Sequence, residues 1–175
     1  MSTSGPGLRP GHDLLSDGEY ASIVRRVLLT GMSGTGKSSV VRELVARGYK
    51  AVDTDDGWSD PQPDGRQLWR EEAIQALLAT EDADVLFLAG CEENQTKFHG
   101  QFDHIVLLSA PIDTLVRRLA TRTNNSYGKT TEELGRFRED VETVEPALRR
   151  IATHEIQTTM PLNDVVTTIL QLVDA

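Results

Sequence analysis

Cysteine, aromatic residues and long apolar runs are scarce or absent in this sequence, and each absence narrows what the protein can be. Cys91 is the one cysteine among 175 residues, so no disulfide can form within the chain. Aromatic residues make up only 5% of the chain, so aliphatic side chains must supply most of the core. No apolar run reaches the roughly 18 residues of a membrane span, and the N-terminal stretch lacks the apolar core of a signal peptide. We therefore expect a cytoplasmic protein that does not enter a membrane.

Positive charge is also scarce relative to negative charge. The chain has 27 acidic and 18 basic residues, and its formal net charge is -9. A negative field repels a polyphosphate backbone, which argues against nucleic acid as the main partner. A small anionic ligand is compatible with this charge, because a few arginines and one helix N-terminus can form a local positive pocket. No pattern in the sequence indicates an oligomeric state.

Two regions of the chain differ in composition. Residues 1–22 are rich in Gly, Pro, Ser and Asp without periodicity, which predicts a flexible N-terminal tail. In residues 23–175, apolar strands alternate with amphipathic helices, which predicts one α/β domain. We expect a three-layer α/β/α sandwich around a five-stranded parallel sheet, with a loop at residues 60–67. The expected strands are 25–30, 49–52, 84–90, 104–109 and 156–159, and the expected helices are 37–48, 68–80, 111–122, 132–154 and 162–173.

The motif with the most specific chemistry is GMSGTGKS, which fits G-x-x-x-x-G-K-[ST], the Walker A or P-loop pattern. Gly31 and Gly36 let backbone amides turn toward phosphate oxygens. Lys37 places a positive charge on the terminal phosphates, and the Ser38 hydroxyl is a ligand for Mg²⁺. A flexible glycine turn could match this sequence motif by chance. Here, however, the motif lies between an expected strand and an expected helix, which is the context that a P-loop requires. We therefore expect ATP and Mg²⁺ to bind here, with further loop contacts from Ser33, Gly34, Thr35 and Ser39.

Asp53 and Asp55 follow the second expected strand, at the edge where parallel sheets present their ligands. Alternate residues of an extended segment share a face, so both carboxylates can point into one cleft. One of them would hold Mg²⁺, and the other would accept the proton of an attacking hydroxyl. The alternative is that DTDDGW is a solvated acidic turn without chemistry.

Together these motifs resemble the small P-loop kinases, a group that includes shikimate kinase, gluconate kinase and the adenylate-kinase-like nucleotide kinases. The resemblance rests on GMSGTGKS, on AVDTD one helix later, and on an arginine-bearing helix before the polar stretch TRTNNSYGKTTEE. It extends over nearly all of residues 25–175. The resemblance implies that Asp53 lies near Mg²⁺, that Asp55 contacts the acceptor hydroxyl, and that a mobile lid spans about residues 122–137.

The same resemblance gives a role to arginines before the lid. Arg118 and Arg122 are one helical turn apart and share a face. Lid arginines of such kinases close over the ATP phosphates, which makes Arg122 the first candidate to stabilise the transferring phosphate and Arg118 the second. The alternative is that Arg117 and Arg118 form a solvated helix face. Near the C-terminus, Thr158 and Thr159 fall where these kinases hold the adenine.

The acceptor side has weaker signals. The resemblance implies a backbone contact from Gly90, and Glu92 would recognise hydroxyls or an amine. Enzymes of this group that bind anionic acceptors usually place arginines in this loop, whereas this chain has acids. Two acceptors stay open: a nucleoside monophosphate held by Arg66 and Arg70, or a neutral polyol or amine held by the acidic loop.

These features predict an ATP-dependent phosphotransferase that moves the γ-phosphate to a hydroxyl or phosphate of a small-molecule acceptor. Its catalytic residues would be Lys37, Asp55 and Arg122. The alternative is a regulatory ATPase, in which Glu92 positions a water, or a nucleotide-binding module without an acceptor. The N-K-x-D run that a GTPase uses for guanine is absent from the sequence.

Overall fold

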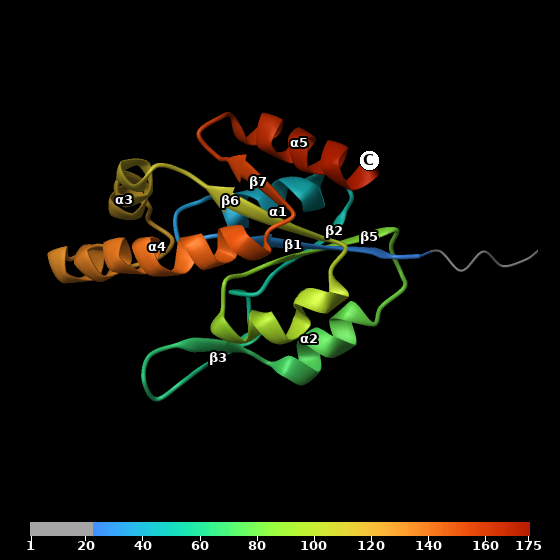
Figure 1. Cartoon of the computed structure of the whole chain (residues 1–175), viewed down its shortest axis with the longest axis horizontal. Coiled ribbons are helices and arrows are strands. Elements are labelled where there is room, and N and C mark those ends of the chain that lie inside the picture. Colours follow the sequence, from blue (N-terminus) through green and yellow to red (C-terminus); the bar gives the residue numbers. More distant parts are fainter. Residues whose placement is uncertain (1–22) are drawn as a thin grey trace, which may run out of the picture.

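A computed structural model describes residues 23–175, and the tail predicted at residues 1–22 lies outside the described residues. The central strands are β1 (Arg25–Thr30), β2 (Lys50–Asp53), β5 (Val85–Ala89), β6 (His104–Ser109) and β7 (His154–Gln157). They form one parallel sheet in the order β2-β5-β1-β6-β7 (Figure 1). In its register Leu28 lies between Leu88 and Ile105. The predicted α/β fold with a five-stranded parallel sheet is confirmed.

Helices cover both faces of this sheet. They are α1 (Lys37–Ala46), α2 (Glu71–Leu78), the 3₁₀ helix η1 (Glu93–Gln101), α3 (Ile112–Thr121), α4 (Thr131–Ile151) and α5 (Leu162–Asp174). Alternate side chains of a strand point to opposite faces. Accordingly, Val27 and Leu29 of β1 pack with α1 and α5, whereas Leu28 packs with α2 and η1. Figure 1 shows α1 and α5 on one side of the sheet and α2 on the other.

A third apolar cluster fixes the end of the molecule that carries α3. Leu115 and Leu119 of α3 pack with Phe137 and Leu148 of α4 around Leu107 of β6. This packing positions the loop between α3 and α4 beside the carboxyl ends of the strands. Among residues 23–175, no helix combines the length and the apolar character that crossing a membrane requires.

The observed strands follow the predicted ones closely, with a shift near the C-terminus. β1 and β6 have the predicted bounds. The helix predicted over residues 132–154 ends at Ile151, and β7 begins at His154, two residues earlier than expected. The cause is Thr153, which donates from its backbone N to Ile105 O at 2.8 Å and accepts from Ile105 N through Oγ1 at 2.9 Å. These bonds join the chain to the sheet before the predicted strand begins.

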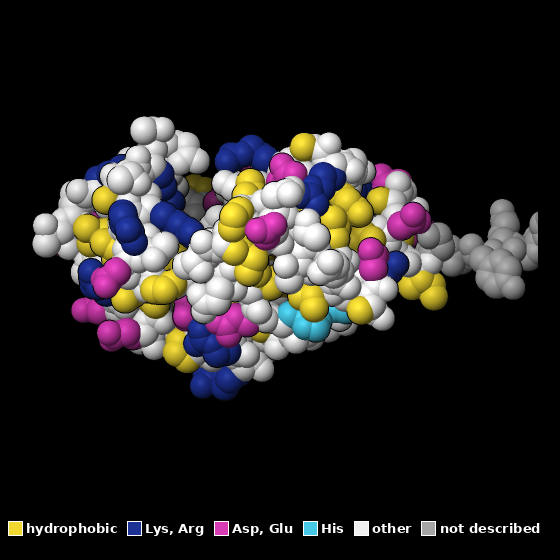
Figure 2. All heavy atoms as spheres, turned by 90° about the horizontal axis from the view of Figure 1, so that it is seen from above, with side chains coloured by type: hydrophobic (Ala, Val, Ile, Leu, Met, Phe, Trp, Pro, Cys, Tyr) yellow, Lys and Arg dark blue, Asp and Glu magenta, His cyan; other side chains and the backbone are white. Residues whose placement is uncertain are grey.

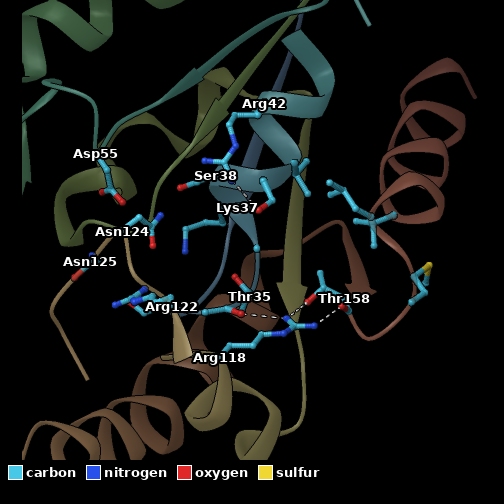
Figure 3. Close-up of a pocket in the computed structure, with 18 residues that line it drawn as sticks. Thr35, Lys37, Ser38, Arg42, Asp55, Arg118, Arg122, Asn124, Asn125 and Thr158 are labelled. Carbon is cyan, nitrogen blue, oxygen red and sulfur yellow. Dashed lines mark hydrogen bonds between the residues drawn. The ribbon is translucent and has the colours of Figure 1, made fainter. Parts of the chain in front are cut away.

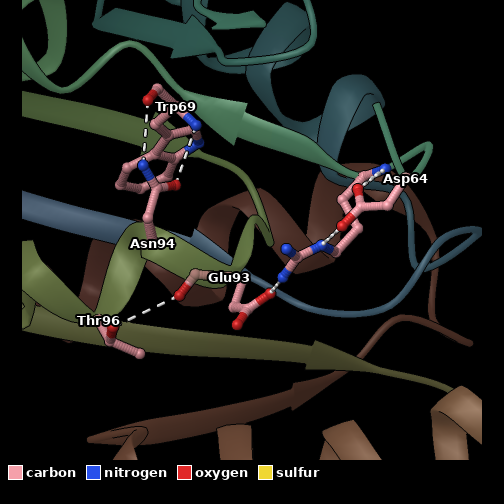
Figure 4. A network of polar contacts seen from close by, with 6 residues as sticks. Asp64, Trp69, Glu93, Asn94 and Thr96 are labelled. Atoms are coloured by element: carbon pink, nitrogen blue, oxygen red, sulfur yellow. Dashed lines mark hydrogen bonds and ion pairs between the residues drawn. The ribbon is translucent and has the colours of Figure 1, made fainter. Parts of the chain in front are cut away.

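The segment after β2 also differs from the prediction. Where a loop and the first helical turn were expected, an antiparallel hairpin forms from β3 (Ser59–Pro61) and β4 (Gln67–Trp69). Asn94 holds Trp69 in the extended form: its Oδ1 accepts from Trp69 N at 2.9 Å, and its Nδ2 donates to Trp69 O at 3.0 Å (Figure 4). Strands this short leave little periodic signal, and their partner lies far along the chain.

Candidate functional site

The conformation of the P-loop requires glycine at its first position. Gly31 follows β1 with a φ of 149°, and a Cβ at this residue would lie 2.3 Å from the carbonyl oxygen of Leu108 in β6. A side chain therefore has no room, because the loop passes directly against the neighbouring strand. Thr35 closes the loop, since its Oγ1 donates to Met32 O at 2.8 Å. The loop turns back into α1 at the carboxyl end of the central strand.

Lys37 and Ser38 are the first residues of α1, and none of the side chains that the structure describes caps this helix. The first backbone N–H groups of a helix lack intrahelical partners, so these donors and the helix dipole favour an anion here. Lys37 Nζ donates to Gly31 O at 2.6 Å and to Met32 O at 3.1 Å, which holds the ammonium group over the loop. The loop thus combines backbone donors with one positive charge, which is the chemistry that a polyphosphate needs.

One cavity of about 380 Å³ brings most of the predicted donor-side residues together. Residues 33–39 of the P-loop form one wall, and Asp55, Arg118 and Arg122 contribute from other segments (Figure 3). Its size falls in the range of small-molecule sites. On the face seen in Figure 2, basic, acidic and hydrophobic side chains are interspersed rather than gathered in one large patch. The other lining residues are Val40, Arg42, Asn124, Asn125, Thr158, Met160, Leu162 and Val165.

Arg118 connects the P-loop to the segment between β7 and α5. Its Nη1 donates to Gly34 O at 3.1 Å and to Thr158 Oγ1 at 3.0 Å, and its Nη2 donates to Thr158 O at 2.7 Å (Figure 3). Thr158 is buried and lines the cavity, whereas Thr159 is exposed and does not. The same wall carries Met160, an apolar side chain that is 37% exposed. An aromatic base suits this combination of a guanidinium group and apolar surface.

Asp53 is the last residue of β2 and Asp55 follows two residues later, at the predicted strand end. Their spacing predicted that both carboxylates could point into one cleft; of the two, Asp55 lines the cavity and Asp53 does not. Asp53 is buried, and its Oδ1 accepts a hydrogen bond from Asp55 N at 3.1 Å. Asp55 lines the cavity and is an exposed residue, although its carboxylate side is partly screened from water by the surrounding segments. Loss of water raises the pKa of Asp55 above its ordinary value, the carboxylates of Asp53 and Glu92 raise it further, and Lys37 opposes them. A carboxyl group with a raised pKa that lines a cavity is suited to accept a proton.

Arg122 lies at the start of the loop after α3 and lines the same cavity. Its Nη2 donates to Tyr127 O at 3.1 Å, while its Nε is buried and has no hydrogen-bond partner among residues 23–175. Burial lowers the pKa of Arg122, and the charge of Asp55 acts in the opposite direction. Figure 3 shows Asn124 between Asp55 and Arg122. Arg122 and Asp55 therefore approach one region of the cavity from different segments.

The segment predicted as a lid contains a loop and the first turns of α4. Lys129 does not line the cavity; its Nζ donates to Leu119 O and to Ala120 O, both at 2.9 Å. These carbonyls end α3, where a positive charge is favourable. Glu133 accepts from the backbone N of Gly128 and of Lys129, each at 3.0 Å, through one carboxylate oxygen. The predicted lid segment is thus bonded to the end of α3 through Lys129 and to the first turn of α4 through Glu133, while Asn124 and Asn125 line the cavity.

Gly90 and Glu92 lie beside the cavity rather than in its wall. Glu92 is 8% exposed and accepts from Ser59 Oγ at 3.0 Å, from Cys91 N at 2.9 Å and from Thr54 Oγ1 at 3.2 Å. A Cβ at Gly90 would lie 2.3 Å from Thr54 Oγ1 and 2.7 Å from a Glu92 carboxylate oxygen. Gly90 therefore permits close packing between β5 and the loop after β2.

Arg66 and Arg70, both predicted as acceptor contacts, are exposed and do not line the cavity. Arg66 Nε donates to Asp64 Oδ2 at 2.8 Å, and its Nη1 donates to Glu93, which belongs to the network in Figure 4. Arg70 Nε donates to Asp60 Oδ1 at 2.7 Å. The structure therefore does not bring either arginine together with Asp55.

The donor set near the P-loop fits Mg²⁺ better than a softer metal. Ser38 lines the cavity and offers a hydroxyl, and Asp53, which does not line it, offers a carboxylate at the end of the neighbouring β2; hard oxygen ligands of this kind are those that Mg²⁺ selects. Within residues 23–175, no group of three or more His, Cys, Asp or Glu side chains is arranged to hold a metal ion. Mg²⁺ keeps several waters and uses phosphate oxygens as ligands, so one hydroxyl and one carboxylate are a sufficient protein contribution.

Sequence reasoning missed two kinds of cavity residue. Arg42 lines the cavity and donates from Nη2 to Ser39 Oγ at 3.2 Å. Its position four residues after Ser38 on a helix would have placed it on the same face. Met160 precedes α5 and Leu162 begins it. Neither residue carries such a signal in the sequence, because tertiary packing brings both to the cavity.

The fold and the cavity define a P-loop nucleotide-binding protein. Residues 27–144 match the family model described as an AAA domain, and this match covers more than half of the chain. The chain therefore belongs to the AAA domain family. No curated protein matches the chain by sequence comparison.

Solved structures of small P-loop kinases share this fold. Shikimate kinase from Acinetobacter baumannii is similar with a TM-score of 0.65 and 19% identity, over 87% of this chain and 94% of that chain. A gluconokinase from Sinorhizobium meliloti gives a TM-score of 0.62 and 19% identity, over 86% and 91% of the two chains. Shikimate kinase from Bacteroides thetaiotaomicron gives 0.56 and 16%, over 86% and 99%. The fold of this chain is that of the small P-loop kinases, which agrees with the resemblance found in the sequence.

Proposed function

We propose that the protein is an ATP-dependent phosphotransferase that moves the γ-phosphate of ATP to a hydroxyl group of a small molecule. The observation that carries this proposal is that one cavity is lined by the P-loop, by Asp55 and by Arg122. A nucleotide-binding module needs the first of these alone. Phosphoryl transfer needs all three, because it depends on positioning and on stabilisation of charge around the transferring group.

Each residue has a distinct task in this proposal. The backbone N–H groups of the P-loop, together with Lys37, bind the phosphates, and Ser38 and Asp53 would hold Mg²⁺. Bound Mg²⁺ neutralises charge on the phosphate oxygens. Arg122 Nη2 is bonded to Tyr127 O, but its Nε has no hydrogen-bond partner within the described part of the chain, so the guanidinium group keeps a donor that a transferring phosphate could satisfy.

Asp55 is the proposed base, or the group that orients the acceptor. Its raised pKa makes its carboxylate a better proton acceptor than an ordinary aspartate. Because Asp55 and the P-loop line the same cavity, the proposal puts the acceptor hydroxyl between this carboxylate and the bound phosphates. The base of the nucleotide would lie against Arg118, Thr158 and Met160 at the other end.

The alternative of a regulatory ATPase uses Glu92 to position a water. The carboxylate of Glu92 already accepts from two hydroxyl groups and one backbone N–H, and it is nearly buried. These bonds weigh against a role in water activation. Asp55 is the acidic side chain that lines the cavity, and it lies where an acceptor would bind.

ADP release, measured with and without mixtures of small hydroxylated molecules, tests the proposal. We expect release to depend on an acceptor, and Asp55→Asn to reduce kcat by roughly 10²–10⁴-fold, the usual contribution of a general base. Nucleotide affinity should be retained in this variant, because Asp55 is not part of the P-loop. Acceptor-independent turnover that survives Asp55→Asn would contradict the proposal.

A further inference from the structure

The loop after α3 presents Asn124 to the cavity on a turn that other residues hold. Asn125 Oδ1 accepts from Tyr127 N at 2.8 Å, and Tyr127 O accepts from Arg122 Nη2 at 3.1 Å. Lys129 Nζ joins the far side of this turn to the end of α3. The side chain of Asn124 takes no part in these bonds, so the form of the turn does not depend on it.

Two amide side chains line the cavity, those of Asn124 and Asn125, and they differ in what they can offer a ligand. The oxygen of Asn125 is already bonded within the turn. The amide of Asn124 is exposed and has no hydrogen-bond partner within residues 23–175. Its Oδ1 is therefore available to accept a hydrogen bond from a ligand, and its Nδ2 is available to donate one.

Asn124 also lies in the part of the cavity where the proposed transfer takes place. Figure 3 shows it between Asp55, the proposed base, and Arg122, the proposed contact of the transferring phosphate. An ionised Asp55 only accepts hydrogen bonds and Arg122 only donates them, whereas an amide does both. A hydroxyl group also does both, so the amide is the matching partner for a hydroxyl at this place. Because the amide is uncharged, this match does not depend on charges elsewhere on the acceptor.

On the basis of the proposed phosphotransfer, we infer that Asn124 determines acceptor specificity by binding a second hydroxyl group of the acceptor, next to the hydroxyl that Asp55 orients. One hydroxyl faces Asp55 and the γ-phosphate, and its neighbour donates to Asn124 Oδ1 or accepts from Asn124 Nδ2. The acceptor is then a molecule with two neighbouring hydroxyl groups rather than one with an isolated hydroxyl. A site that hydrogen-bonds a substrate hydroxyl discriminates against the analogue that lacks it, because a polar group of the site is left unpaired.

Acceptors that differ by one hydroxyl group test this assignment. The probes are three pairs: glycerol with propane-1,3-diol, cis-cyclohexane-1,2-diol with cyclohexanol, and methyl β-D-ribofuranoside with its 2-deoxy analogue. The kcat/KM of acceptor-dependent ADP release is measured with ATP and Mg²⁺ for the wild type and for Asn124→Ala. We expect the wild type to prefer the neighbouring-hydroxyl member of at least one pair by roughly tenfold, and Asn124→Ala to reduce this preference to about twofold or less.

Ser126→Ala is the matched control, because Ser126 is exposed in the same loop and does not line the cavity. This variant should keep the wild-type preference. The Kd of a non-hydrolysable ATP analogue, measured by calorimetry, should be the same for Asn124→Ala and the wild type. A Kd raised about fivefold or more would assign the amide to the nucleotide, and an equal loss of kcat/KM for both members of a pair would show that the amide does not recognise the second hydroxyl.

Either result would overturn the inference and leave the proposed transfer intact. The inference also fails if no neighbouring-hydroxyl probe stimulates ADP release, or if the isolated-hydroxyl probes stimulate it equally. The transfer itself is contradicted by a different result, which is acceptor-independent release that survives Asp55→Asn.

Discussion

Arg118 and Thr158 are 40 residues apart in the chain and are joined by two hydrogen bonds, from Nη1 to Thr158 Oγ1 at 3.0 Å and from Nη2 to Thr158 O at 2.7 Å. The same guanidinium group donates to Gly34 O in the P-loop. One side chain thus fixes the phosphate-binding loop relative to the wall where the nucleotide base is proposed to lie. We therefore propose that Arg118 shapes the donor site and that Arg122 contacts the transferring phosphate.

Arg118→Ala should therefore weaken nucleotide binding more than catalysis. Hydrogen bonds to charged groups contribute about 1.5–3 kcal/mol each, so we expect the Kd for ATP to rise by roughly tenfold or more. The measurement is calorimetric titration with a non-hydrolysable analogue. Arg117→Ala is the matched control, because Arg117 is exposed on the same helix. Equal affinities of the two variants would contradict the assigned role of Arg118.

Gly31→Ala should destabilise the protein even without nucleotide. The added Cβ would lie 2.3 Å from Leu108 O, so the loop or β6 must shift. At Gly36, which also has a positive φ, a Cβ meets nothing within 4 Å. We expect Gly36→Ala to cost about 1 kcal/mol from the backbone conformation alone, and Gly31→Ala to cost clearly more. Urea unfolding of both variants without ligand provides the comparison, and a smaller cost at Gly31 would contradict it.

Asp55→Asn should change the pH dependence of both activity and stability. The raised pKa means that the folded state favours the protonated carboxyl, so this contribution to stability is present in acid and is lost as the pH rises through the folded pKa. At neutral pH the variant should therefore unfold at a higher temperature than the wild type, and the difference should vanish in acid. Thermal unfolding across pH measures this, with Asp56→Asn as the control.

Activity should fall as the pH drops through the raised pKa of Asp55, because the protonated carboxyl cannot accept the acceptor proton. The acid limb of kcat/KM in the wild type should lie above the value of 3.8 for an ordinary aspartate. The residual activity of Asp55→Asn should lack this limb. An acid limb that is unchanged in the variant would assign the proton transfer to another group.

Asn94→Ala should destabilise the hairpin of β3 and β4. The substitution leaves Trp69 N and Trp69 O, both buried, without their hydrogen bonds to Asn94. Unsatisfied buried groups cost about 1–3 kcal/mol each, so unfolding free energy should fall by roughly 2 kcal/mol or more. Chemical denaturation gives the value, and Thr96→Ala, at an exposed residue of η1, serves as the control. A loss no larger than that of the control would mean that other contacts hold the hairpin.

The sequence predicted the structure best where a local pattern of residues has one physical explanation, as in the apolar strands and the P-loop motif. The apolar runs at Arg25–Thr30 and His104–Ser109 identified their strands, because buried parallel strands are apolar throughout. The P-loop motif identified the residues that form one wall of the cavity. Residues that act through distant partners were harder to predict: the ion pairs of Arg66 and the bonds of Lys129 to the end of α3 depend on the folded arrangement. Met160 lines the cavity because of tertiary packing, and no sequence motif predicts its position there.

The fate of the γ-phosphate distinguishes transfer to an acceptor from hydrolysis of ATP. ATP labelled at the γ-phosphate is incubated with the protein, Mg²⁺ and a mixture of neutral and aminated sugars and polyols, and the labelled products are separated. The account predicts label in a phosphorylated organic product, in amounts that match ADP and that fall strongly in Asp55→Asn. Label found in inorganic phosphate alone, at a rate that is the same with and without acceptors, would contradict it.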